Sequence, residues 1–161
     1  SSDVCSSDLP TNLYGPYDNF DLRNAHVLPS LIRRFVEAKD KKSPTVALWG
    51  TGSPTREFLH VDDLASAIIR IEEKYDSDDH INIGTGDEIS IKELAKLVSD
   101  LVEYKGEILW DSSKPDGTPR KVLDITKIQN LGWKPEINLI NGISQTISWF
   151  REAVKGGYAR L

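Results

Sequence analysis

WGTGSPTREFLHVDDLA, residues 49–65, is the stretch that decides the fold class of this 161-residue chain. Residues 45–49 have the apolar character of a short buried strand, and the glycine turn after them leads into a second extended segment at 56–60. A helix is expected at 61–75, with two aspartates in its first turn, where carboxylates favour the helix dipole. The residues expected on its apolar face are Val61, Leu64, Ala65, Ile68 and Ile71.

The alternation of strand and helix continues on both sides of this stretch. Apolar spacing predicts helices at 28–36, 90–104 and 139–154, and the second of these begins with a capping-box pattern, Ser-x-x-Glu. HINIGTG, residues 80–86, is typical of a strand that runs into a glycine turn, and 107–110 is a further strand candidate. Strands that alternate with helices favour an α/β or an α+β fold.

Composition excludes several classes of function. The net charge of −5 argues against a general nucleic-acid or anionic-membrane surface. Because Cys5 is the one cysteine, no internal disulfide can form, and no Cys/His cluster has the spacing of a zinc site. The apolar runs are too short for a membrane span. We therefore expect a cytoplasmic protein without a metal site.

The two ends of the chain differ from its middle. Residues 1–9, SSDVCSSDL, are polar and aperiodic, so a disordered or artefactual leader is expected there. The absence of methionine, even at position 1, indicates that the numbered start is not the natural one. One folded unit is expected over 10–154, followed by a frayed tail at 155–161.

Two features near the beginning could carry chemistry. PTNLYGP, residues 10–16, is a stiff loop that can present donors and acceptors to a ligand, although an ordered structural turn is the alternative. His26 precedes an apolar helix and could exchange a proton near neutral pH. A capping or surface role is the alternative for this histidine.

Several other polar residues could bind an anionic ligand. Arg33 and Arg34 are adjacent, so a helix directs them differently and at most one is expected to meet a given ligand. Arg56 follows the glycine turn, where its guanidinium could hold phosphate oxygens, and Trp49 could pack on a base or sugar. Asp116, in the basic loop KPDGTPRK, could accept from sugar hydroxyls or could only stabilise a turn.

Two motifs of cofactor chemistry are missing from the sequence. No G-x-G-x-x-G follows a strand, and no tyrosine has a lysine four residues later. A complete reduction site therefore cannot be assembled from this chain.

The motifs that are present resemble one family. Six motifs occur in the order and spacing of the GDP-L-fucose synthases. They are PTNLYGPYDNF, a histidine before VLPSLIRRF, WGTGSPTREFLHVDDLA, NIGTG, SKPDGTPRKVLD and LGW. These synthases are NADP-dependent enzymes of the extended short-chain dehydrogenase/reductase family. The resemblance implies an α/β fold: the carboxy-terminal, substrate-binding part (residues 10–154) of an extended NAD(P)-binding Rossmann-like enzyme, with the Rossmann nucleotide-binding half mostly missing.

The same resemblance implies roles for matching residues. His26 matches a catalytic acid/base of the epimerisation, and it also lies near the cofactor. The residues implied to contact NADP(H) are Pro10, Thr11, Asn12, Leu13 and His26. Those implied to bind the GDP-sugar are Arg34, Trp49, Arg56 and Asp116.

The implied reaction converts GDP-4-keto-6-deoxy-D-mannose to GDP-L-fucose, by epimerisation at C3 and C5 and reduction at C4. The family's catalytic cysteine and its Ser-Tyr-Lys set belong to the missing half, so the chain is expected to be inactive alone and its parent to be a homodimer. The alternatives are a part of another nucleotide-sugar epimerase or dehydratase, and a non-catalytic sugar-nucleotide binding module.

Overall fold

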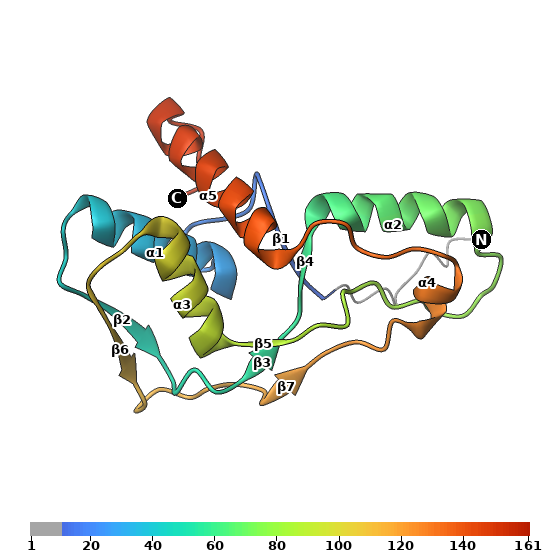
Figure 1. Ribbon diagram of the computed structural model, residues 1–161, viewed down its shortest axis with the longest axis horizontal. Helices are drawn as coiled ribbons and strands as arrows, with labels where there is room; N and C mark the ends of the chain where they lie inside the picture. Colours follow the sequence, from blue (N-terminus) through green and yellow to red (C-terminus); the bar gives the residue numbers. More distant parts are fainter. Residues whose placement is uncertain (1–10) are drawn as a thin grey trace.

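The computed structural model describes residues 11–161, and Figure 1 shows an elongated molecule in which helices and short strands alternate. The expected strand at 45–49 and the expected helices at 61–75, 90–104 and 139–154 are all present. In chain order the elements are β1 (Asn12–Tyr14), α1 (Val27–Asp40), β2 (Thr45–Trp49), β3 (Thr55–Arg56), β4 (Phe58–His60), α2 (Val61–Lys74), β5 (Ile89–Ser90), α3 (Ile91–Val102), β6 (Glu107–Asp111), β7 (Arg120–Lys121), α4 (Thr126–Asn130) and α5 (Leu139–Gly156).

The strands form three small sheets in the described residues. β1 pairs with β4 in parallel, and β2 pairs with β6 in parallel. The third sheet has the order β5-β3-β7, with β3 antiparallel to β5 and parallel to β7. Two segments that lie far from β3 in the sequence, β5 and β7, therefore pair with it on either side. Parallel pairing and helical crossovers give the α/β class that the sequence predicts.

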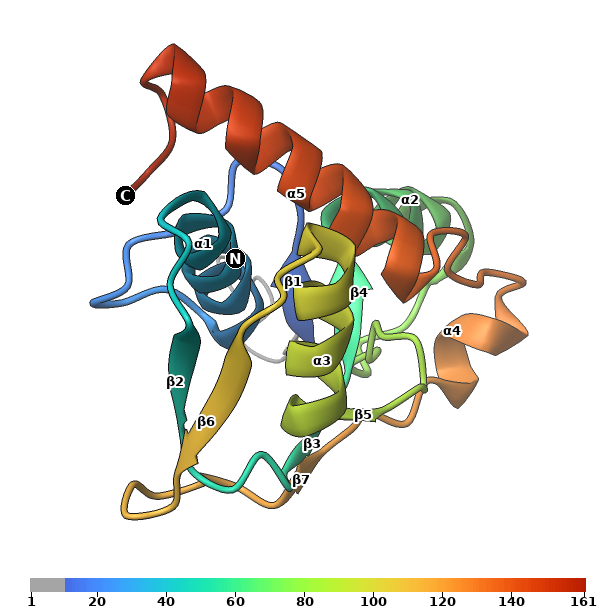
Figure 2. The ribbon, with the colours of Figure 1, turned by 60° about the vertical axis from the view of Figure 1, so that its left-hand side comes forward.

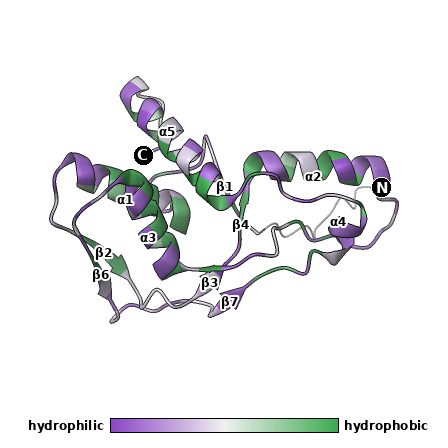
Figure 3. Cartoon of the chain, viewed as in Figure 1, coloured by the Kyte–Doolittle hydropathy of each residue, from purple (hydrophilic) through white to green (hydrophobic). Residues whose placement is uncertain are grey.

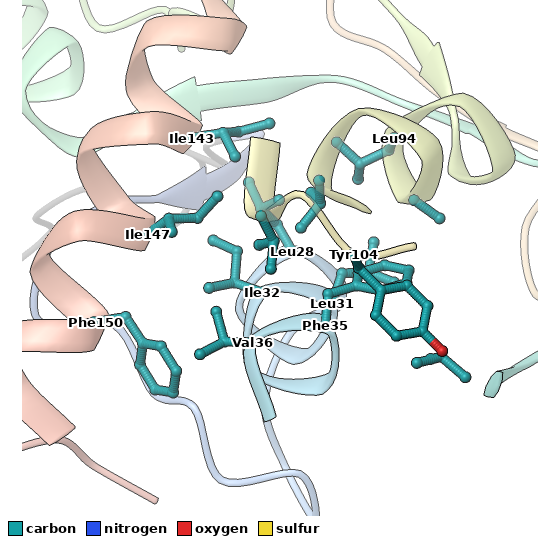
Figure 4. Packing of buried hydrophobic residues seen from close by; sticks show 14 of the residues in the cluster. Leu28, Leu31, Ile32, Phe35, Val36, Leu94, Tyr104, Ile143, Ile147 and Phe150 are labelled. Carbon is teal, nitrogen blue, oxygen red and sulfur yellow. The ribbon is translucent and has the colours of Figure 1, made fainter. Parts of the chain in front are cut away.

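Two apolar clusters hold these elements together. In the larger cluster, α1 lies beside the β2–β6 pair and α3 packs against both α1 and α5 (Figure 2), and Figure 4 shows the side chains that these three helices contribute. Its fully buried members include Ile32, Phe35, Leu94 and Phe150. The capping box that begins α3 is present, because the Ser90 side chain accepts from the backbone of Glu93. In the smaller cluster, Leu59 and Ala67 pack with Ile81, Ile128 and Trp133.

The apolar face predicted for α2 is wrong in part. Leu64 and Ile71 do pack against the smaller cluster, but Val61, Ala65 and Ile68 are exposed. Asp63 is buried instead, because its carboxylate accepts the N–H groups of Glu136 and Ile137, each at 3.0 Å. Figure 3 shows that hydrophobic residues occur among hydrophilic ones along this helix.

The strand predicted within HINIGTG is also wrong. Within the described residues, 81–84 join no sheet, although Ile81 and Ile83 are buried as strand residues would be. The physical reason is that no partner strand lies beside 81–84 in the described residues, and the turn that follows is held by the Glu57 carboxylate, which accepts from the N–H groups of Thr85 and Gly86.

The final residues run back along the loop that follows β1. The Phe20 N–H donates to the Arg160 carbonyl at 2.9 Å, and the Tyr158 ring packs edge-on against Trp149. Residues 155–161 thus differ from the frayed tail that composition suggests. In the part of the chain that is described, no helix is both long and apolar enough to cross a membrane. The expected leader and Cys5 lie outside the described residues.

Candidate functional site

The loop that carries the predicted cofactor residues is anchored on the segment between β3 and β4. The Thr11 hydroxyl and the Asn12 side-chain amide both donate to the carbonyl oxygen of Glu57, at 3.0 and 2.8 Å. Leu13 continues β1 and packs against the smaller apolar cluster. These contacts fix the loop on a neighbouring strand. Pro10 lies outside the described residues.

A pocket of about 560 Å³ opens beside this loop. Thr11, Asn12 and Leu13 line it together with His26, so the structure gathers the described members of the predicted cofactor group around one cavity. Lys121, from β7, lines the same pocket. We call this cavity the loop pocket.

His26 occupies the N-cap position of α1, as its sequence context predicts, but its side chain makes no capping hydrogen bond. The imidazole is exposed on the loop pocket and is available for other partners. Asp18 is a half-buried carboxylate that lines the same pocket. Burial raises the pKa of this carboxyl, against the opposing effects of the Asn19 N–H and of the charges on His26 and Arg160.

The two adjacent arginines of α1 have different environments. Arg33 donates to the Glu37 carboxylate at 2.6 Å and to the Phe20 carbonyl at 3.0 Å, which accounts for it structurally. Arg34 contacts the Ser30 hydroxyl at 3.2 Å, and among the described residues no carboxylate lies within 4 Å of it. The expectation that the two arginines point differently is confirmed, and Arg34 is the one free to meet an anion.

Arg34 and Trp49 lie together at a second pocket, of about 220 Å³, which we call the tryptophan pocket. Trp49 ends β2 and is 71% exposed, so its ring is not part of the core. Trp110, paired with Leu48 across the β2–β6 sheet, lines the same pocket. The Lys114 ammonium lies 5.8 Å from the centre of the Trp49 ring.

Arg56 lies on the central strand of the third sheet. Its guanidinium donates to the Thr55 carbonyl at 2.7 Å, and no acidic group in the described residues is within 4 Å of it. Arg56 is the register partner of Lys121, and Lys121 lines the loop pocket. The strand that bears Arg56 is thus next to the strand that borders the predicted cofactor residues.

Asp116 ties two loops together. Its carboxylate accepts from the Thr51 N–H at 2.6 Å and from the Thr51 hydroxyl at 2.7 Å. These contacts hold the pKa of the Asp116 carboxyl below its usual value. The side chain is exposed, but the glycine turn already uses both oxygens. Gly50 has a positive φ of 82°, and a side chain there would collide with Asp116.

Three residues of this region had not been predicted as functional: Glu57, Trp110 and Lys121. Lys121 is one charge of the basic loop KPDGTPRK, and no local pattern places it beside the residues 11–13. Trp110 reads as a strand residue, and its neighbour Trp49 is 61 positions away, so no local pattern joins them. Glu57 has a signal in the sequence, because a carboxylate in the extended segment predicted at 56–60 needs polar partners once it is buried.

The sequence is similar to one family of known proteins. Residues 7–84 match the model of the NAD dependent epimerase/dehydratase family. The chain is 57% identical over 148 residues to a probable GDP-L-fucose synthase of Oryza sativa, covering 92% of this chain and 45% of the relative. It is 50% identical to the GDP-L-fucose synthase of Escherichia coli, covering 91% of this chain and 48% of that protein.

A solved structure has the same fold. The GDP-L-fucose synthetase of Naegleria fowleri, crystallised with NADP, superposes with a TM-score of 0.88 at 30% identity, covering 96% of this chain and 48% of that one. The chain therefore spans about half the length of the relatives that it matches.

Proposed function

We propose that this chain is the carboxy-terminal, substrate-binding part of a GDP-L-fucose synthase, because residues 7–84 match the model of the NAD dependent epimerase/dehydratase family and the chain is similar in sequence to such synthases. The parent enzyme would convert GDP-4-keto-6-deoxy-D-mannose to GDP-L-fucose with NADPH, as a cytoplasmic homodimer. The observation that carries this proposal is identity of 50–57% to synthases along about nine-tenths of the chain.

The loop pocket supports a role toward the cofactor. Thr11, Asn12 and Leu13 lie on a loop that two side-chain hydrogen bonds hold in place, so its polar atoms need little reordering when a ligand arrives. We assign these residues, with Pro10 and His26, to contact with the nicotinamide end of NADP(H). When bound, NADPH supplies the hydride that reduces C4.

His26 is proposed as the acid/base of this chain. The C4 ketone of the substrate acidifies the hydrogens at C3 and C5, so a correctly placed base and acid are enough for epimerisation. The imidazole suits this work because it faces the loop pocket and has no capping role. Histidine can take up and return a proton near neutral pH without any metal.

The cations that lack a carboxylate partner support a diphosphate ligand. Arg34 and Arg56 belong to this group in the described part of the chain, and a guanidinium can hold two phosphate oxygens at once. The exposed ring of Trp49 offers a flat surface on which the nucleotide can pack. Asp116 completes the proposed set, by holding the glycine turn and offering remaining lone pairs to ligand hydroxyls.

A binding experiment with the full-length protein separates this proposal from its rivals. Isothermal titration with GDP-L-fucose and with a UDP-hexose measures nucleotide selectivity directly. Tight GDP-sugar binding with at least tenfold weaker UDP-sugar binding, about 1.4 kcal/mol, supports the synthase. Preference for the UDP-sugar would favour another nucleotide-sugar epimerase or dehydratase. GDP-sugar binding by a complete gene product that lacks any Rossmann half would favour a non-catalytic binding module.

A further inference from the structure

Glu57 is a charged residue in the interior of the molecule. It lies between β3 and β4 and has 0% exposed surface. Its carboxylate accepts from the N–H groups of Gly86 at 2.7 Å and Leu123 at 3.0 Å, and from the N–H and hydroxyl of Thr85. Every partner is a donor, which suits a carboxylate that acts only as an acceptor.

These bonds join segments that are far apart in the sequence. Thr85 and Gly86 belong to the glycine turn before β5, and Leu123 follows β7. Gly84 leaves room for the carboxylate, because a Cβ at that position would overlap the Glu57 oxygens. A buried carboxylate is costly unless it is fully paired, so this cluster holds together the segments on both sides of the Arg56 strand.

The backbone of the same residue holds the predicted cofactor loop. The Glu57 carbonyl accepts from Thr11 and Asn12, while the preceding residue is Arg56. The side chain therefore fixes the strand from one side and the carbonyl fixes the loop from the other. Glu57 itself does not line the loop pocket or the tryptophan pocket.

We propose that Glu57 is the positioning residue that sets the cofactor loop relative to the Arg56 strand. It thereby aligns the residues assigned to the nicotinamide with the arginine assigned to the diphosphate of the substrate. This inference rests on the proposed function. It goes beyond the ligand contacts, because Glu57 acts through the residues that it holds. A displacement of about 1 Å between reacting groups can lower turnover roughly 10²-fold, so a buried anchor of this kind has a measurable effect on catalysis.

The test is Glu57→Gln in the full-length protein. Glutamine keeps the size of the side chain, but its NH₂ group must face an N–H that the carboxylate had accepted. Amide hydrogen exchange at Thr85, Gly86 and Leu123 should accelerate about tenfold or more. The kcat should fall roughly 10²-fold, and the Kd of NADPH, measured for the folded fraction, should rise.

Glu88→Gln is the matched control. Glu88 is an exposed glutamate that accepts from Arg120 and Thr55 and joins the same strands at the surface. Exposed ion pairs contribute little, so this variant should leave kcat, the Kd of NADPH and the three amides unchanged.

A purely structural role gives a different result. Loss of stability alone lowers the folded fraction but leaves kcat and the NADPH Kd of folded molecules unchanged, and that outcome would overturn the proposal. If Glu57→Gln does not fold, exchange in the wild-type protein decides, because these three amides lie outside helices and strands and, among the described residues, donate to no acceptor other than the Glu57 carboxylate. Unprotected amides would then sink the proposal. A folded wild type without GDP-sugar turnover would refute the proposed function instead.

Discussion

His26 is the residue whose chemistry is tested most simply. In the full-length protein, His26→Asn should lower turnover by about 10²–10⁴, the range for loss of a general acid/base, because asparagine cannot exchange the proton. Steady-state kinetics with the GDP-sugar and NADPH measures this. His80→Asn changes an exposed histidine away from both pockets and serves as the control. Equal turnover in the two variants would remove His26 from the mechanism.

The adjacent arginines make a second matched pair. Arg34→Ala should raise the KM for the GDP-sugar about 10- to 100-fold, because a charged hydrogen bond to the ligand is lost. Arg33→Ala should instead lower the thermal midpoint, since it breaks contacts to Glu37 and Phe20, and should leave that KM near the wild-type value. Kinetics and thermal denaturation of both variants distinguish these outcomes. A larger KM effect at Arg33 would reverse the assignment.

Sequence reasoning located single residues better than it located their partners. The place of His26 at the start of a helix and the place of Trp49 at the end of a strand depend on neighbouring residues, and both were predicted correctly. The partners of Glu57 could not be predicted, because Gly86 and Leu123 lie 29 and 66 positions away. The choice between Arg33 and Arg34 also needed the fold, which brings Phe20 beside one of them.

At the scale of elements, α2 has an apolar surface that the described residues do not cover. Ile68 and Ile69 are 52% and 57% exposed, and Val61 is exposed at the start of the helix. Exposed aliphatic side chains in one row favour association. Since the chain spans about half the length of its relatives, we expect the remaining half of the parent to pack on this face.

Substitution on α2 tests that expectation. In the 161-residue chain, Ile68→Glu with Ile69→Glu should reduce self-association in sedimentation velocity. In the full-length protein, the same change should destabilise by about 1.5–3 kcal/mol for each side chain that the missing half buries. Val154→Glu, on the exposed side of α5, controls for added charge. A full-length protein that tolerates the α2 change as well as the Val154 change would contradict the expectation.

The elements themselves were largely predictable from periodicity, and the exceptions have definite causes. The spacing at 90–104 and the capping box specify α3 locally. Periodicity did not show that Asp63 would be the buried residue of α2, because its partners Glu136 and Ile137 come from the segment before α5. Periodicity also predicted a strand at 81–83. Ile81 and Ile83 are buried as expected of a strand, but no strand pairs with them in the described residues.

At the scale of the whole molecule, the three sheets are small and depend on distant pairings. The parallel pair β1–β4 has only two strands in the described residues, and an isolated pair of this kind is at best marginally stable. The sequence predicted the α/β class, but not which strands would pair. We expect the parent to supply further strands to this sheet, together with a Rossmann domain upstream of Pro10 that has the glycine fingerprint and Tyr-x-x-x-Lys.

The central claim is that this chain provides the substrate-binding part of a GDP-L-fucose synthase, and turnover by the full-length protein tests it most directly. The protein is incubated with NADPH and GDP-4-keto-6-deoxy-D-mannose, while NADPH consumption is followed optically and the sugar product is identified by NMR. We predict NADPH oxidation that accompanies formation of GDP-L-fucose, with inverted configuration at C3 and C5. A folded, NADPH-binding protein that leaves this substrate unchanged would contradict the account.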